Sequence, residues 1–164
     1  MDPGPTRMEA AGRVGIPQVL VPGCVDFVTA GRYEETERAF PDRRLYRHNP
    51  ELTLVRLTAA EMRRMGEVFA LKASAAEGPV AVCIPTQGFS VPDSEGGAFW
   101  DVEADFEFTS ALQANVSSRV QVQLVDAHVN DESFVDVVVG TLLSMLDRPA
   151  AATATQRSND DADR

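Results

Sequence analysis

The chain has 164 residues, of which 44% are hydrophobic, and a formal net charge of -10. This length suits one domain that buries roughly two-thirds of its unfolded surface. The acidic balance argues against a nucleic-acid-binding protein, which needs a clustered basic face. No apolar run approaches the ~20 residues that cross a bilayer, so no membrane-spanning segment is expected.

The amino-terminal segment MDPGPTRMEAAGR lacks the apolar core of a signal peptide, so we expect a cytoplasmic protein. The two cysteines, Cys24 and Cys83, do not have the spacing of a metal site. Each lies in an apolar segment, and a buried free thiol is the expectation for both.

The first half of the chain predicts short elements. Gln18–Val21 is an apolar run that ends at Pro22-Gly23, as expected of a strand followed by a turn. A short acidic helix is expected over Tyr33–Ala39, and Pro41 stops it. The alternation of Leu, Thr, Leu, Val, Arg and Leu then predicts a strand over Leu52–Leu57.

The second half predicts helices that alternate with strands. Thr58 and Glu61 have the spacing of a capping box, at the start of a helix that runs to Ala73. The two later helices begin at Asp101 and at Asn130 or Asp131, and both carry an apolar stripe at helical spacing. The apolar runs at 80–84 and 120–125 are predicted to be the strands between these helices.

This order of elements predicts an α/β fold with a small, mostly parallel sheet of about four to five strands. Helices are expected on both faces, in a Rossmann- or flavodoxin-like arrangement of three layers. We assign the domain to residues 15–147. Residues 1–14 are interpreted as the remnant of a connection between domains. Residues 148–164 are expected to be a disordered tail, because they lack the apolar content to pack.

A polar rim is predicted at one edge of this sheet, because ligands of open α/β sheets bind beyond the carboxyl ends of the strands. If Leu52–Leu57 is one of the parallel strands, Thr58 joins this rim. Helix N-termini near the rim favour anions, whereas its carboxylates imply that a highly charged anion would bring a cation. The candidate ligand-binding residues of the rim are Gly23, Asp26, Thr86, Gln87, Gly88, Asp93, Asn130 and Asp131.

Three residues of the same edge are candidates for catalysis. Asp126 and His128 are two apart at a strand end, so both can point to one face, where a carboxylate would raise the basicity of the imidazole. Ser90 would be the nucleophile if it lay within hydrogen-bond reach. However, GFSVP departs from the GxSxG nucleophile elbow, and these side chains could instead satisfy backbone donors. A metal site from Asp126, His128 and Asp131 is a further alternative, but no strict ligand spacing is present and no metal ligand is assigned.

Four segments together resemble one protein family. They are similar, in order and spacing, to the carboxyl-terminal domain of the uncharacterised two-domain proteins typified by the tomato mosaic virus resistance protein of tomato, a family that resembles an ATP-binding domain. The resemblance runs from about Met8 to Leu146. Its segments are GIPQVLVPGCVDFV at 15–28, LYRHNPELTLVRLT at 45–58, IPTQGFSVPDSEGGAFWD at 84–101 and DAHVND at 126–131.

The resemblance implies a domain without an established reaction, and whether the chain is an enzyme stays open. It implies that a nucleotide-binding half is a separate partner, so a nucleotide cofactor is expected only together with that half. Self-association is the other expected partnership, and neither nucleic acid nor a membrane is expected. The alternative function is a small stand-alone hydrolase or transferase centred on Ser90 and His128.

Overall fold

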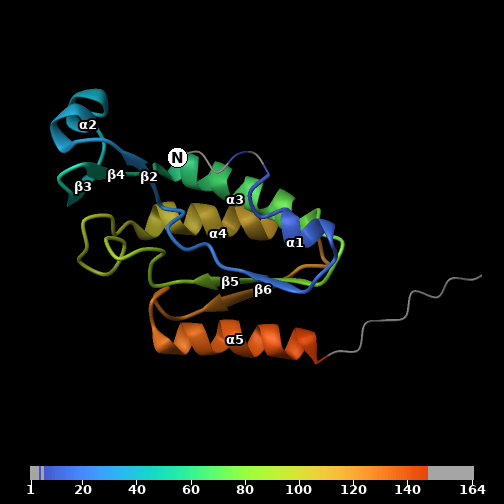
Figure 1. The fold of residues 1–164 in the computed structure, drawn as a ribbon. Coiled ribbons are helices and arrows are strands. Elements are labelled where there is room, and N and C mark those ends of the chain that lie inside the picture. Colours follow the sequence, from blue (N-terminus) through green and yellow to red (C-terminus); the bar gives the residue numbers. More distant parts are fainter. Residues whose placement is uncertain (1–3, 5, 148–164) are drawn as a thin grey trace, which may run out of the picture.

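The computed structural model describes residue 4 and residues 6–147, which form three layers (Figure 1). A parallel sheet lies in the middle, with α3 (Ala59–Ser74) and α4 (Val102–Asn115) on one face and α5 (Glu132–Leu146) on the other. The predicted α/β class and the helices on both faces are therefore confirmed. Within the described residues, no helix is both long enough and apolar enough to cross a membrane.

The parallel sheet has three strands, in the order β1 (Gln18–Leu20), β5 (Val80–Pro85) and β6 (Gln121–Val125). Every residue of β5 is buried, as expected of a central strand that is covered on both faces. Because the three strands run in the same direction, the loops that follow them meet at one end of the sheet. This arrangement builds the predicted rim.

Close packing of α3 on α4 depends on a glycine. A Cβ atom at Gly66 would lie only 2.3 Å from the carbonyl oxygen of Phe108. The two helices can therefore approach until Met62 and Phe69 of α3 are buried with Phe108 of α4 against the sheet. The predicted capping box is present, since the Thr58 hydroxyl accepts from the Glu61 N–H and the Glu61 carboxylate accepts from the Thr58 N–H.

A second, antiparallel sheet lies at one end of the molecule (Figure 1), in the order β2 (Phe27–Ala30), β4 (Leu52–Arg56) and β3 (Leu45–Asn49). This corrects the prediction that Leu52–Leu57 belongs to a parallel sheet of four to five strands. β4 pairs antiparallel with both of its neighbours, which leaves three strands in the parallel sheet. The physical reason is the two-residue connection between β3 and β4, since parallel neighbours need a crossover of about a dozen residues.

The helix α2 (Tyr33–Ala39) joins β2 to β3 and has the predicted bounds. Glu34 of this helix forms an ion pair with Arg47 of β3, and the Arg47 guanidinium lies over the Tyr33 ring. The helix therefore belongs to the antiparallel sheet and does not cover the parallel one.

The segment before β1 packs against the domain. It contains α1 (Ala10–Arg13), whose Gly12 is buried beside Ala76, and Glu9 forms an ion pair of 2.7 Å with Lys72 of α3. The interpretation of residues 1–14 as a remnant of a connection between domains stays a prediction. The expected disorder of residues 148–164 concerns residues outside the described part of the chain.

Candidate functional site

The loop after β5 is held against the loops after β1 and β6 by backbone hydrogen bonds. The Cys24 N–H donates to the Phe89 carbonyl at 2.8 Å, and the Val129 N–H donates to the Gly88 carbonyl at 3.2 Å. Gly88 is needed in this contact, because its φ is +116° and a Cβ atom there would lie 1.7 Å from the Asp93 carbonyl oxygen. The structure thus brings the three predicted parts of the rim together.

Part of the exposed rim is a short polar ridge formed by Thr86, Gln87 and Asp126. The Gln87 amide donates to the Asp126 carboxylate at 2.6 Å, and the Thr86 hydroxyl is 3.4 Å from the same carboxylate oxygen. These bonds tie the end of β5 to the end of β6. The ridge presents hydroxyl, amide and carboxylate groups to solvent, so it can both donate and accept hydrogen bonds.

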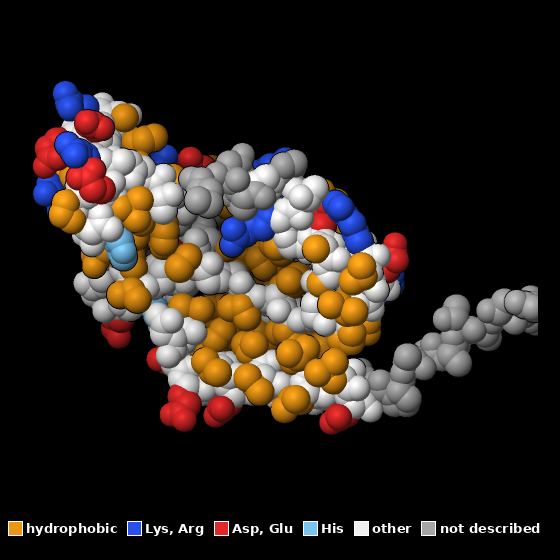
Figure 2. Space-filling model, in the orientation of Figure 1, with side chains coloured by type: hydrophobic (Ala, Val, Ile, Leu, Met, Phe, Trp, Pro, Cys, Tyr) orange, Lys and Arg blue, Asp and Glu red, His pale blue; other side chains and the backbone are white. Residues whose placement is uncertain are grey.

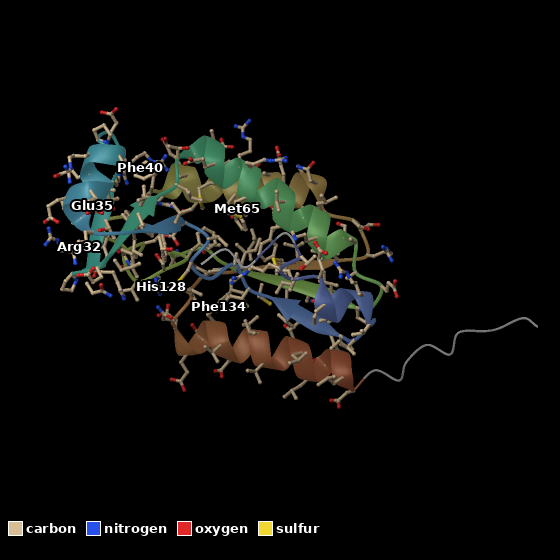
Figure 3. The ribbon with its side chains drawn as sticks, turned by 45° about the horizontal axis from the view of Figure 1, so that its top comes forward. Arg32, Glu35, Phe40, Met65, His128 and Phe134 are labelled. Atoms are coloured by element: carbon tan, nitrogen blue, oxygen red, sulfur yellow. The ribbon has the colours of Figure 1, made fainter. Side chains whose placement is uncertain are left out.

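His128 lies near the amino-terminal end of α5 (Figure 3), where its ring bonds to two backbone groups. Its Nδ1 accepts from the Asn130 N–H at 3.2 Å, so the ring proton is on Nε2, which lies 2.9 Å from the Ser90 carbonyl oxygen. The Asp131 carboxylate accepts from the His128 N–H at 2.8 Å. The imidazole therefore clamps the loop after β5 to the start of α5.

The Ser90 hydroxyl donates to Asp26, at 2.7 Å, and not to His128. Ser90 is 2% exposed and Asp26 is fully buried. Asp126, the third member of the candidate catalytic set, bonds to Gln87. The contacts of the described residues therefore do not join Ser90, His128 and Asp126 into a nucleophilic triad, and the serine hydroxyl is shielded from solvent.

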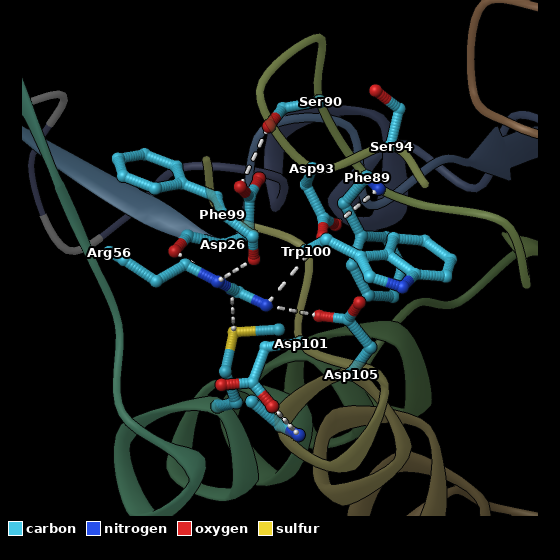
Figure 4. A network of polar contacts seen from close by, with 12 residues as sticks. Asp26, Arg56, Phe89, Ser90, Asp93, Ser94, Phe99, Trp100, Asp101 and Asp105 are labelled. Atoms are coloured by element: carbon cyan, nitrogen blue, oxygen red, sulfur yellow. Dashed lines mark hydrogen bonds and ion pairs between the residues drawn. The ribbon is translucent and has the colours of Figure 1, made fainter. Parts of the chain in front are cut away.

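Beneath the loop lies a buried polar cluster, which we define as Asp26, Arg56, Ser90, Asp93 and Asp105 (Figure 4). The Arg56 side chain is 3% exposed and lies 2.5 Å from the Asp105 carboxylate and 3.8 Å from that of Asp93. The Asp93 carboxylate also accepts from the Phe89 N–H at 2.8 Å. The cluster thus joins the β1–β2 connection, β4, the loop and α4.

Arg56 also donates to two backbone carbonyls, that of Phe99 at 2.9 Å and that of Asp26 at 3.0 Å. These bonds hold the loop after β5 and the β1–β2 connection on the end of β4. Because guanidinium has five donors in a fixed plane, one arginine can satisfy groups from three segments at once.

The cluster holds three carboxyl groups and one guanidinium, and the pKa values of the carboxyl groups reflect this excess of acid. Burial raises the pKa values of Asp26 and Asp93. Burial, followed by the neighbouring Asp93 carboxylate, raises the pKa of Asp105 to about 7. Asp105 therefore carries a proton over much of the acidic and neutral range.

The remaining candidate residues make contacts that hold the fold together. Gly23 lies beside the Val129 side chain, and the Asn130 N–H belongs to the His128 clamp. Thr58 caps α3 after the antiparallel β4, so it is not at the end of a parallel strand. Within the described residues, no group of three or more His, Cys, Asp or Glu side chains is placed to hold a metal ion.

Sequence reasoning missed Arg56 and Asp105. Charged residues are expected at the surface, and nothing in LTLVRLT distinguishes a buried arginine from one at the edge of a sheet. In the folded chain, Arg56 follows three residues that are all buried in β4. An arginine at the end of such a run needs buried acceptors, and Asp26, Asp93 and Asp105 provide them.

Comparisons with known proteins show the family of the chain. Residues 1–146 match the model of the uncharacterised protein family UPF0261, C-terminal domain. The chain belongs to this family. A UPF0261 protein of Clostridium tetani is 36% identical over 149 residues, which are 90% of this chain and 37% of that protein. A UPF0261 protein of Rhizobium meliloti is 36% identical over 135 residues, 81% of this chain and 34% of that protein.

A plant protein is similar over nearly the same region. The ToMV resistance protein Tm-1(GCR237) of Solanum lycopersicum is 32% identical over 142 residues, which are 85% of this chain and 19% of that protein. The UPF0261 domain described here thus spans little more than a third of its bacterial relatives and a fifth of the tomato protein. The predicted family resemblance is confirmed.

Proposed function

We propose that this UPF0261 domain supplies one wall of a ligand site, and that a separately encoded nucleotide-binding half supplies the other wall. The observation that carries the proposal is the ridge of Thr86, Gln87 and Asp126, which is exposed at the carboxyl ends of two parallel strands. This is where open α/β sheets bind ligands. The ridge lies on the outside of the domain, so a ligand there needs a second surface to enclose it.

Two hollows of the domain lie away from the ridge. One of about 390 Å³ lies between β6 and α5 and is lined by Gln123 and Thr141, and one of about 160 Å³ lies between α1 and α3. Neither includes a residue of the ridge. Enclosed ligand pockets usually bury most of the ligand surface, and the two hollows do not provide this at the rim.

The chemistry of the ridge suits a phosphate-bearing ligand that arrives with a cation. The Thr86 hydroxyl and the Gln87 amide are donors for phosphate or sugar oxygens. The Asp126 carboxylate would repel a bare anion, but it is a ligand that Mg²⁺ accepts. ATP with Mg²⁺ is therefore the first ligand to test, in the cytoplasmic setting expected from the sequence.

The test compares the chain alone with the chain mixed with a nucleotide-binding half. The probe for that half is the part of the Clostridium tetani UPF0261 protein that precedes its matched region, and Mg-ATP binding is measured by calorimetry. We expect tighter binding by the mixture than by either part. Gln87→Ala and Asp126→Asn should each weaken it about tenfold, the size of one lost hydrogen bond to a charged group. Thr29→Ala, on β2 of the antiparallel sheet, is the matched control. Equal binding by the mixture and by the probe alone would contradict the proposal.

The contacts of Ser90 do not favour the stand-alone hydrolase, because its hydroxyl is buried and bonded to Asp26. A screen of ester and phosphoester substrates with the chain alone still tests it. Turnover by the wild type that is lost in both Ser90→Ala and His128→Ala would establish the hydrolase in place of the shared site.

A further inference from the structure

An apolar stripe runs along the outer face of α5. Four side chains form it at positions i, i+4, i+8 and i+11, and each is about half exposed: Val135, Val139, Leu143 and Leu146. The core does not need them, because Phe134 and Met145, on another side of the helix, are the buried residues of α5. A helix on the surface of a globular domain normally has a polar outer face.

The stripe lies beside an open sheet edge. β1 pairs only with β5 in the described sheet, so its other edge carries backbone groups without a strand partner. Val19 and Val21 pack on the same cluster as Phe134 of α5. Just before β1, Val14 and Ile16 are 71% and 53% exposed. Figure 2 shows hydrophobic side chains gathered over this face, along α5 and the adjoining part of the sheet.

We propose that this surface, the β1 edge with the α5 stripe, binds a strand and a helix from the amino-terminal part of a UPF0261 protein. The strand extends the sheet by pairing with β1, and the helix packs along the stripe. This inference rests on the proposed function for the existence of the partner half. It adds the surface that holds the two halves together, which is separate from the ridge that contacts the ligand.

The sizes of the relatives support this occupant. The matched part is the C-terminal domain of its family and covers 37% of the Clostridium tetani protein, so most of that protein lies in another part. The polypeptide enters the described domain through α1 and β1. A preceding part of a relative would connect through α1, the element immediately before β1. Parallel sheets also need cover on both faces, and α5 alone covers one of them.

Charge distinguishes this partner from a second copy. The segment 120–147 contains no Lys or Arg, whereas Glu132, Asp136 and Asp147 lie on or next to α5. Two copies of α5 would bring only acidic groups together, which is unfavourable. The same charges repel the anionic surface of a membrane. The partner helix is therefore expected to flank its apolar stripe with Lys or Arg.

The experiment measures association of this chain with the amino-terminal part of the Clostridium tetani protein by sedimentation. Leu143→Glu should weaken association at least tenfold, as expected for an apolar residue at the centre of an interface. Leu71→Glu, a 69% exposed leucine on α3 at the opposite face, is the matched control and should leave association unchanged. Circular dichroism melting checks that both variants are folded.

Hydrogen exchange supplies an independent measurement. Amides of β1 and α5 should gain protection in the complex. No association, equal effects of the two variants, or protection confined to the loop after β5 would overturn the inference. A dimer of this chain alone that Leu143→Glu dissociates would assign the surface to a second copy instead. Association that depends on Leu143 but without Mg-ATP binding would refute the proposed function and leave this inference in place.

Discussion

Replacing Asp105 with asparagine tests whether the buried polar cluster holds an excess of acid. In the folded chain the pKa of Asp105 is about 7, raised from its ordinary value of 3.8 by burial and by Asp93. Because each pKa unit corresponds to about 1.4 kcal/mol, this difference amounts to about 4 kcal/mol. Asparagine has the shape of the protonated carboxyl group and does not titrate.

The direction in which stability changes with pH depends on whether the folded or the unfolded chain retains the proton. Below pH 3.8 the carboxyl is protonated in both the folded and the unfolded chain. Between pH 3.8 and about 7 the unfolded chain releases the proton and the folded chain retains it, so stability falls as the pH rises. The contribution of the raised pKa is fully present at the low end of this window and lost at its high end.

Urea unfolding at a series of pH values measures the effect. Relative to Asp105→Asn, the wild type should lose about 4 kcal/mol of unfolding free energy between pH 4 and pH 8. Taking the difference between the two proteins removes most of the contribution of other titrating groups. Glu103→Gln, on the exposed side of the same helix, should show the same pH dependence of the unfolding free energy as the wild type. A difference between Asp105→Asn and wild type that is constant across this range would refute the reasoning.

Three further predictions concern packing and charge. Arg56→Met should lower the unfolding free energy by about 3–5 kcal/mol at neutral pH, because it leaves buried carboxylates without a cation; a loss below 1 kcal/mol in urea unfolding would contradict this. Gly66→Ala should destabilise the protein because its Cβ atom would meet a carbonyl of α4. At Gly140 an added Cβ atom would meet no packed neighbour within 4 Å, so Gly140→Ala should stabilise α5 by about 1 kcal/mol. A thermal melt in which Gly66→Ala is more stable than Gly140→Ala would contradict the proposed role of Gly66 in packing. The expected burial holds for Cys83 but is wrong for Cys24, which lies exposed in the turn after β1. Burial raises the pKa of the Cys83 thiol. A thiol reagent should therefore label Cys24 in the native protein and Cys83 only after unfolding, whereas equal labelling rates in the native protein would show that Cys83 is accessible.

The long helices and the parallel strands β5 and β6 could be predicted from the sequence because their signals are local. The Thr58–Glu61 capping box and the Asp101 cap mark helix starts within three residues, and both are present. β2 and β3 were missed because their strands have four and five residues and their burial patterns do not alternate. Their stability comes from pairing with β4, a partner that no local pattern identifies.

The candidate site was predicted in position but not in its contacts. The rim followed from the strand ends, so the predicted neighbours Gln87, Asp126 and His128 do lie at one edge. The hydrogen-bond partners could not be predicted, because they depend on how closely the loops approach one another in the folded chain. The Ser90 hydroxyl meets Asp26, 64 residues earlier in the chain, and no spacing rule connects these two positions.

The pairing of β1 with β5 has a consequence for the order in which the chain assembles. Gln18 pairs with Val80, and the antiparallel sheet and α3 lie between them in the sequence. Closing a loop of roughly sixty residues contributes on the order of 3–4 kcal/mol of unfavourable entropy, whereas β3 and β4 are nearly adjacent. We therefore expect the antiparallel sheet and the α3–α4 pair to form early. β1, with only three residues to pair, would then join last and leave first, so the amino-terminal edge governs the final step of folding.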